Sequence, residues 1–156
     1  MLRFQSLDDI RNLVGTVLPY GGWIRIDQER VNRFADLTED HTWLHVDVER
    51  AATGPYAGTI AHGFLTLSLI PLLARQVYAL ELPGQMVNYG VDGVRFPAAV
   101  PTGRRIRSRI TPRAVEEHTR GHRILLHHEV EVEDQERPGC VADTIFFVLP
   151  AEESAA

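Results

Sequence analysis

Residues 62–80 read HGFLTLSLIPLLARQVYAL and form the most strongly helical segment predicted from the chain. The segment is rich in leucine, which ranks among the best helix formers. Few of its positions are polar, so the predicted helix is buried on most of its sides. Pro71 removes one backbone donor and crowds the carbonyl four residues earlier, so we expect it to kink the helix or to tighten a turn.

Everything after Pro83 is predicted to be extended. Runs rich in β-branched and aromatic residues, separated by glycine, proline or charged turns, are typical of strands. Four such runs cover residues 86–96, 104–115, 122–132 and 140–149. One buried helix followed by consecutive strands, without βαβ alternation, indicates an α+β fold with an antiparallel sheet. We expect that sheet to wrap around the helix, so that both bury their apolar surfaces.

Shorter elements are predicted ahead of the central helix. Ser6 is placed to cap a helix over residues 7–14, and residues 23–26 favour a strand. Asp27 is the expected N-cap of a second helix, and Asp47 is the expected N-cap of a third, short one.

The length and composition of the chain fit one folded domain. A chain of 156 residues can bury a single sizeable core, and its 44% hydrophobic and 24% charged residues are typical of globular proteins. We expect the domain to span residues 1–151 and residues 152–156 to form a frayed tail.

The charge pattern argues against nucleic acid as a partner. The formal net charge is -5, which provides no basic footprint for phosphate neutralisation. Residues 104–109, RRIRSR, form one local basic run. Its alternation favours the outward face of a strand, and a patch for an anionic ligand such as a nucleotide phosphate is the second interpretation.

Cysteine content and hydropathy bear on the compartment. Cys140 is the single cysteine, so no intramolecular disulfide or CxxC pair can form. Its place in an apolar run favours a small core residue over a nucleophile. No segment reaches the roughly 18 apolar residues that a membrane span needs, and the N-terminus lacks the apolar core of a signal peptide. We therefore expect a cytoplasmic protein without a membrane partner.

An acid and a base stand five residues apart, at Asp40 and His45. On a continuous helix their side chains would point about 140° apart, so only an irregular segment can bring them to one water molecule. Histidine suits proton transfer because its unperturbed pKa is about 6.5. The spacing alone favours the simpler interpretation, in which Asp40 caps a turn and His45 is an ordinary half-buried histidine.

Other polar residues compete for these roles. Asp47 lies two residues after His45, but helix capping explains it better. His41 lies beside Asp40 in a polar loop, where exposure is the simpler interpretation. The remaining histidines of the strand region show no metal-ligand spacing, so we expect no metal site among them: His118, His122, His127 and His128.

Gly63 stands at the start of the predicted central helix. The first NH groups of a helix lack intrahelical acceptors and carry the positive end of the helix dipole, so they suit an oxyanion. A glycine there lets a carbonyl oxygen approach the backbone closely. Close packing of the helix against the sheet would also select a glycine.

Taken together, residues 34–73 resemble the MaoC-type hydratase family of hot-dog proteins, in particular its nodulation-protein-N-like branch. The resemblance rests on two motifs: Phe34-Ala35-x-x-Thr38-x-Asp40-x-x-x-x-His45-x-Asp47 followed by Ala51-Ala52, and Ile60-Ala61-His62-Gly63-Phe64-Leu65-Thr66. A weaker continuation over residues 88–90 and 94–103 extends the resemblance to most of the chain.

The resemblance implies a fold, a reaction and a set of site residues. The antiparallel sheet of a single hot-dog domain would wrap the central helix, and two subunits would pair into a homodimer with sites near the interface. Asp40 and His45 would hold the water that adds to a trans-2-enoyl thioester, giving an (R)-3-hydroxyacyl thioester. The Gly63 NH would bind the thioester carbonyl, and His62 and Arg95 are weaker substrate-binding candidates. The reaction needs no metal or bound redox cofactor. Its acyl group is expected on coenzyme A, with an acyl carrier protein as the alternative.

This sequence departs from the commonest family motif at three places. Glu39 stands where many members have glycine, Thr42 where many have asparagine, and Trp43 where many have proline. All three bear on the backbone path of the loop and on the shape of the acyl pocket.

Two other functions remain open at this point. A hot-dog thioesterase would use a carboxylate to activate water against the thioester carbonyl itself. A non-catalytic acyl-thioester binding subunit would keep the motif only for folding, and the three departures motivate that hypothesis. The pair of Asp40 and His45, with His62 and Gly63 at the helix start, matches the hydratase pattern better.

Overall fold

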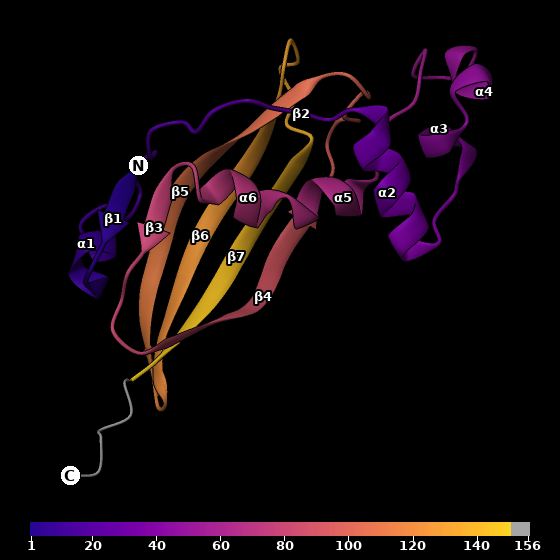
Figure 1. Cartoon of the computed structure of the whole chain (residues 1–156). Coiled ribbons are helices and arrows are strands. Elements are labelled where there is room, and N and C mark those ends of the chain that lie inside the picture. Colours follow the sequence, from indigo (N-terminus) through magenta and orange to yellow (C-terminus); the bar gives the residue numbers. More distant parts are fainter. Residues whose placement is uncertain (151–156) are drawn as a thin grey trace.

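The computed structural model describes residues 1–150, and its centre is a strongly curved antiparallel sheet (Figure 1). Five strands lie in the order β2-β5-β6-β7-β4. They are β2 (Ile24–Arg25), β4 (Gln85–Arg95), β5 (Arg105–His118), β6 (Gly121–Val132) and β7 (Cys140–Leu149). The four long strands confirm the extended runs predicted after Pro83 and their antiparallel pairing. The predicted domain end at residue 151 and the predicted tail over residues 152–156 lie outside the described residues.

Side chains alternate between the two faces of the sheet, as the period of a strand requires. On β5, Ile106 and Ile110 are buried in the core. The arginines next to them point outward and pair across the strands with glutamates: Arg105 with Glu133, Arg107 with Glu131 and Arg109 with Glu129. These pairs confirm that the basic run is the outward face of a strand, because each of the three charges is matched by a carboxylate.

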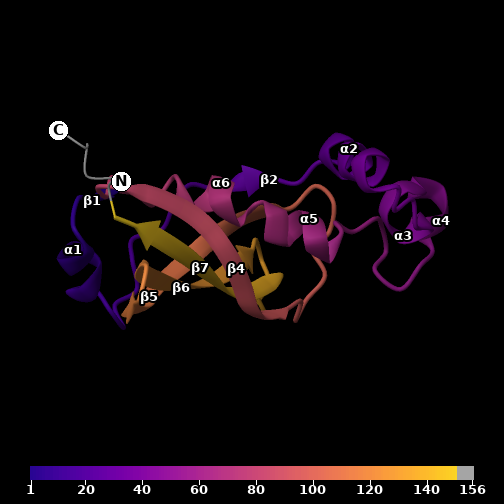
Figure 2. The ribbon, with the colours of Figure 1, turned by 90° about the horizontal axis from the view of Figure 1, so that it is seen from below.

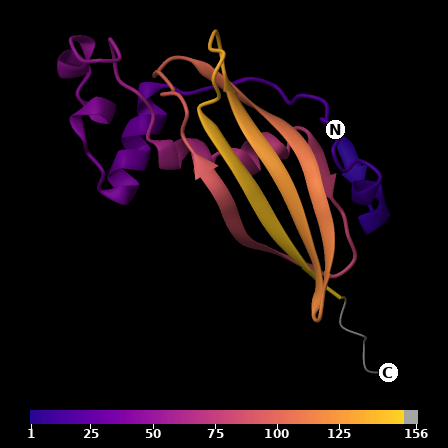
Figure 3. The same cartoon turned by 180° about the vertical axis from the view of Figure 1, so that it is seen from behind.

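The predicted central helix is divided into two short helices. α5 (Gly63–Ser68) and α6 (Ile70–Ala74) follow one another along one face of the sheet, with Leu69 between them (Figure 2). The opposite face carries no helix over its strands in the part of the chain that is described (Figure 3). Pro71 lies in the first turn of α6, where the missing NH removes no intrahelical bond. The helix is interrupted at Leu69, two residues before Pro71, which confirms the expected disturbance of the helix near this proline.

The prediction that this helix continues as far as Leu80 was wrong. Residues Tyr78–Leu80 instead form β3, which pairs in parallel with β1 (Leu2–Phe4). The Leu2 NH also donates to the Val77 carbonyl at 2.8 Å. Pairing with a segment more than 70 residues away overrides the local helix propensity of the end of this segment.

Four further helices precede the central pair: α1 (Leu7–Arg11), α2 (Gln28–Thr38), α3 (Trp43–Val46) and α4 (Val48–Ala52). Three predicted N-caps are confirmed, because Ser6, Asp27 and Asp47 each accept a hydrogen bond from a backbone NH of the helix that follows. The first helix ends at Arg11, before the predicted end at residue 14. Helices α2, α3 and α4 extend beyond the sheet from the start of α5 (Figures 1 and 3). No helix among residues 1–150 has the length and apolar character needed to cross a membrane.

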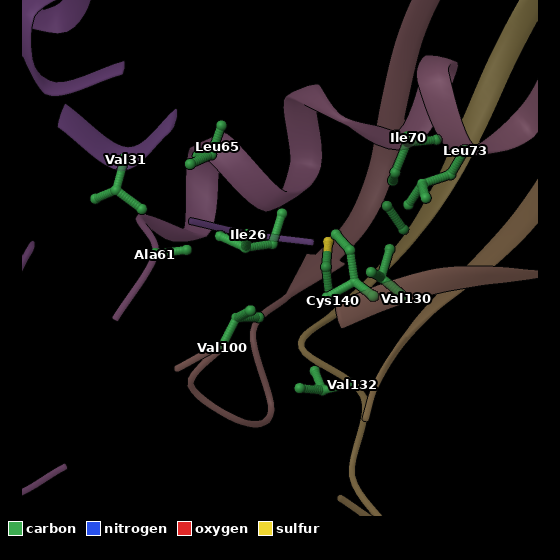
Figure 4. Packing of buried hydrophobic residues seen from close by; sticks show 12 residues of the cluster. Ile26, Val31, Ala61, Leu65, Ile70, Leu73, Val100, Val130, Val132 and Cys140 are labelled. Atoms are coloured by element: carbon green, nitrogen blue, oxygen red, sulfur yellow. The ribbon is translucent and has the colours of Figure 1, made fainter. Parts of the chain in front are cut away.

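Two hydrophobic clusters fill the space between the helices and the sheet. One cluster joins Leu65 of α5 and Leu73 of α6 to residues of the strands (Figure 4). Cys140 is fully buried in this cluster, and burial raises the pKa of its thiol to about 11. Its prediction as a small core residue is thereby confirmed. The second cluster packs α1 and β3 against the other half of the sheet and includes Ile10, Tyr78 and Leu126.

Candidate active site

Three polar side chains meet where α2, α3 and α5 come together. Asp40 follows the end of α2, His45 lies within α3, and His62 is the residue before α5. One polar atom from each side chain lies within 4.8 Å of the other two. The irregular segment that the sequence required between Asp40 and His45 is therefore present, and it brings the two side chains together.

Asp40 is held as a carboxylate by its neighbour Thr42. The Thr42 hydroxyl donates to Asp40 Oδ1 at 2.7 Å, and the Thr42 NH donates to the same oxygen at 3.3 Å. These hydrogen bonds, the one from the hydroxyl first, lower the pKa of the Asp40 carboxyl below its usual value. The side chain is half exposed, and its second oxygen, Oδ2, lies 4.0 Å from His62 Nε2.

His45 presents one ring nitrogen to the site and uses the other for anchoring. Its Nδ1 lies 2.7 Å from the carbonyl oxygen of Ile60. A carbonyl only accepts hydrogen bonds, so Nδ1 carries the proton and Nε2 of the neutral ring carries the lone pair. Gln28 Nε2 donates to the backbone carbonyl of His45 at 2.7 Å and fixes the residue from the α2 side. This anchoring leaves Nε2 of His45 available to the site.

His62 lies behind this pair and is almost completely buried, with 3% of its surface exposed. Its ring stacks on the ring of His45 with a centroid separation of 3.8 Å and an interplanar angle of 29°. Its Nε2 donates to the backbone carbonyl of Asp40 at 3.0 Å. Burial lowers the pKa of His62 below its usual value, so this imidazole is neutral at neutral pH.

A cavity of about 220 Å³ opens beside His45 and Gly63. Gly63 is the first residue of α5, so its NH has no acceptor within that helix. α5 has six residues, so its dipole at Gly63 is weaker than that of the long helix predicted from the sequence. A Cβ on Gly63 would lie 2.9 Å from the ring of Phe96, so close packing also requires glycine here. Both interpretations of Gly63 thus have a structural basis.

The other candidate site residues from the sequence lie outside the cavity or make structural contacts. Arg95 is exposed on β4, where its guanidinium donates to the carbonyl of Val94 at 2.7 Å, and it does not line the cavity. Asp47 caps α4, as predicted, by accepting from the Arg50 NH at 3.0 Å. His41 is exposed, as predicted, and its Nε2 lies 3.0 Å from Asp36 Oδ1.

Two of the departures from the commonest motif, Glu39 and Trp43, differ from glycine and proline in backbone strain and in side-chain contacts. Glu39 ends α2 with φ of 60° and ψ of 16°, the left-handed conformation that favours glycine. Trp43 is the first residue of α3, where proline is well tolerated. Its ring instead stacks under the Arg50 guanidinium at 4.4 Å. Glu39 thus adopts a backbone conformation that glycine favours, and Trp43 contacts α4 through Arg50.

The sequence interpretation missed Gln28 and Tyr56. Gln28 ties three segments together, because it donates to the His45 carbonyl and accepts from the Thr59 hydroxyl at 2.6 Å. Tyr56 lines the cavity from the turn after α4. No local pattern marks either residue, since both owe their roles to contacts between segments distant in the sequence.

The chain matches the MaoC-like domain family over residues 9–134. It is 44% identical over 146 residues to 3-hydroxyacyl-thioester dehydratase Z of Mycobacterium tuberculosis, covering 93% of this chain and 97% of that protein. It is 39% identical over 155 residues to nodulation protein N of Rhizobium leguminosarum bv. viciae, covering 92% of this chain and 91% of that protein.

Solved structures agree with this assignment at the level of the fold. The (R)-hydratase of A. caviae superposes with a TM-score of 0.65 at 21% identity, covering 84% of this chain and 97% of that chain. The MaoC-like dehydratase of Rhodospirillum rubrum gives a TM-score of 0.70 at 19% identity, covering 92% of this chain and 97% of that chain. The predicted hot-dog fold is thereby confirmed. The chain belongs to the MaoC-like dehydratase family and is a hydro-lyase.

Proposed function

We propose that this protein catalyses the (R)-specific hydration of trans-2-enoyl-coenzyme A, and the reverse dehydration of the (R)-3-hydroxyacyl ester. The observation that carries the proposal is the convergence of Asp40 with His45, which lines the same cavity as Gly63. The name of the relative 3-hydroxyacyl-thioester dehydratase Z supports the same reaction and substrate class.

The two side chains have complementary states for holding one water molecule. The Asp40 carboxylate accepts a hydrogen bond from one O–H of the water. The lone pair on His45 Nε2 accepts a hydrogen bond from the other O–H. As the water oxygen bonds to C3, His45 takes that proton and becomes an imidazolium. The resulting hydroxyl group stays on C3.

The electron pair of the C2=C3 bond moves toward the thioester oxygen during this addition. The Gly63 NH donates a hydrogen bond to that oxygen and stabilises the enolate-like charge. The imidazolium of His45 then gives its proton to C2, which restores the neutral ring and completes the addition of water. The dehydration follows the same steps in reverse.

The edge of the sheet provides the surface for a homodimer. β4 is the last strand in the sheet order, and residues on both of its faces are exposed. Four of them are large and apolar: Met86, Val87, Tyr89 and Val91. A long apolar strand edge left unpaired is prone to self-association, so a second copy pairing along β4 would cover it.

A single set of assays separates the three candidate functions. Crotonyl-coenzyme A and longer trans-2-enoyl esters are mixed with the protein, and loss of enoyl absorbance, release of free thiol and ester binding are measured. The proposal expects loss of absorbance without thiol release, and the (R)-3-hydroxyacyl ester as product. Thiol release would identify a thioesterase, and binding without turnover at every chain length would identify a non-catalytic subunit. Repeating the assay with the acyl group on an acyl carrier protein decides the carrier.

A further inference from the structure

His62 occupies a place where an apolar ring would fit and yet it is a histidine. It is 3% exposed and packed between the rings of Phe34, at 5.0 Å, and His45, at 3.8 Å. Its Nδ1 is buried without a hydrogen-bond partner. A buried polar group without a partner costs about 1–3 kcal/mol. Stability alone therefore favours an apolar ring at this position over the imidazole.

The other ring nitrogen gives a reason for the histidine. Nε2 donates to the backbone carbonyl of Asp40 at 3.0 Å. Asp40 lies in an exposed turn directly after Glu39, whose left-handed backbone ends α2. The bond from His62 joins this turn to the start of α5, and the stacked ring fixes the plane of His45.

We propose that His62 is a positioning residue, which holds Asp40 and His45 at the separation and orientation needed to share one water molecule. This inference rests on the proposed hydratase function. It replaces the substrate-binding role predicted for His62 from the resemblance. His62 does not line the cavity, and its Nε2 proton is engaged with a backbone carbonyl, so it acts through the other two side chains.

Two isosteric variants test this role. Glutamine places its amide nitrogen near the position of Nε2, so His62→Gln keeps a donor for the Asp40 carbonyl. Asparagine places its amide nitrogen near the position of Nδ1, so His62→Asn lacks that donor. We expect kcat to fall by about 100-fold in His62→Asn and by about 10-fold or less in His62→Gln, because misplacement by about 1 Å costs on that scale. The KM should change little in both variants.

A ring variant and a remote variant complete the experiment. His62→Phe keeps the stack and the volume but removes the donor. We expect it to lose kcat as His62→Asn does, while its melting temperature stays equal to that of the wild type or rises, because the unpartnered Nδ1 is gone. His128→Gln changes another buried histidine, on β6, and should leave kcat unchanged. Amide hydrogen exchange over residues 39–45 should be faster in His62→Asn and His62→Phe than in the wild type, independently of activity.

The outcomes separate the inference from the function on which it rests. Equal kcat in the glutamine and asparagine variants, or a loss confined to KM, would overturn the positioning role while an active wild type upholds the hydratase. A wild-type kcat in His62→Phe would also overturn it. A wild-type protein that hydrates no enoyl ester would overturn both.

Discussion

The sheet and the candidate active site each bury one histidine, and the two surroundings differ. In the sheet, both nitrogens of His128 are matched, with Nδ1 at 3.3 Å from Ser108 Oγ and Nε2 at 3.0 Å from Thr144 Oγ1. In the site, His62 bonds through Nε2 alone and leaves Nδ1 without a partner. The sheet thus satisfies both nitrogens of its buried histidine, whereas the site leaves one nitrogen of His62 unsatisfied while the other fixes the backbone at Asp40.

We therefore expect changes in the site to affect the rate of hydration and changes in the sheet to affect the free energy of unfolding. Substitutions of the polar side chains of the site should change the rate of hydration with little effect on unfolding. Substitutions and protonation in the sheet should change unfolding with little effect on the rate at neutral pH.

The largest effect is expected from the two side chains that converge on the water. Asp40→Asn and His45→Ala should each lower kcat between roughly 100-fold and 10,000-fold, the range for positioned acid and base groups. The melting temperature should change little, because Asp40 is exposed and His45 is only partly buried. Enoyl absorbance and thermal denaturation measure the two quantities. If both variants hydrated the substrate at the wild-type rate, Asp40 and His45 would not be the catalytic residues.

Acid should destabilise the sheet through His128. Burial lowers the pKa of this histidine from 6.5 to about 4, so the unfolded chain binds more protons than the folded one between these values. Stability contributed by the neutral imidazole is complete above pH 6.5 and is lost as the pH falls toward 4, by about 3 kcal/mol in total.

Urea unfolding of wild type and His128→Gln across pH 4 to 7 measures this contribution. Carboxylates that titrate in the same range are common to both proteins, so the difference between the two curves isolates the histidine. Parallel curves would show that His128 is protonated as readily in the fold as in the unfolded chain.

A methyl group at Gly63 should lower the rate to an intermediate extent. Gly63→Ala keeps the NH but places a Cβ where the carbonyl oxygen is proposed to approach, and a loss of roughly 10-fold or more in kcat is expected. The Cβ would also lie 2.9 Å from Phe96, so the same change is made in Phe96→Ala as a control. A loss that persists without the Phe96 ring supports carbonyl binding. Full recovery would mean that glycine is needed there only for packing.

The smallest effect is expected at Glu39. Its φ of 60° strains any side chain with a Cβ, so Glu39→Gly should raise the free energy of unfolding by up to about 1 kcal/mol. Leu37→Gly, at an exposed position inside α2, serves as the control and should lower it by about 1 kcal/mol. Denaturant unfolding measures both changes. A loss of stability in Glu39→Gly would contradict the strain argument.

The sheet was predictable from the sequence because its signal is local and repeated. The alternation of Ile106, Ser108 and Ile110 with outward arginines defines the faces of β5 within a few residues. The end of the central helix was not predictable in this way. Tyr78 is a strand residue only because β1, far away in the sequence, lies beside it.

The site was predictable only in part. The Asp40 and His45 pair followed from the family motif, because the spacing alone favoured an ordinary turn. Gln28 and Tyr56 contribute through contacts across the fold, and nothing in their neighbours in the sequence distinguishes them. The unpartnered Nδ1 of His62 likewise depends on burial that only the packed structure creates.

The arginine and glutamate pairs on the outer face carry little information about strand alignment. Three arginines on β5 face three glutamates at the same spacing, so a slip of two residues would still match two of the pairs. These ion pairs therefore do not choose among such slips. The choice must come from features that occur only once: the short turn at Thr119 and Arg120, and the irregularity between Pro112 and Ala114. A change to either of these should cause misaligned strands more readily than the removal of any one ion pair.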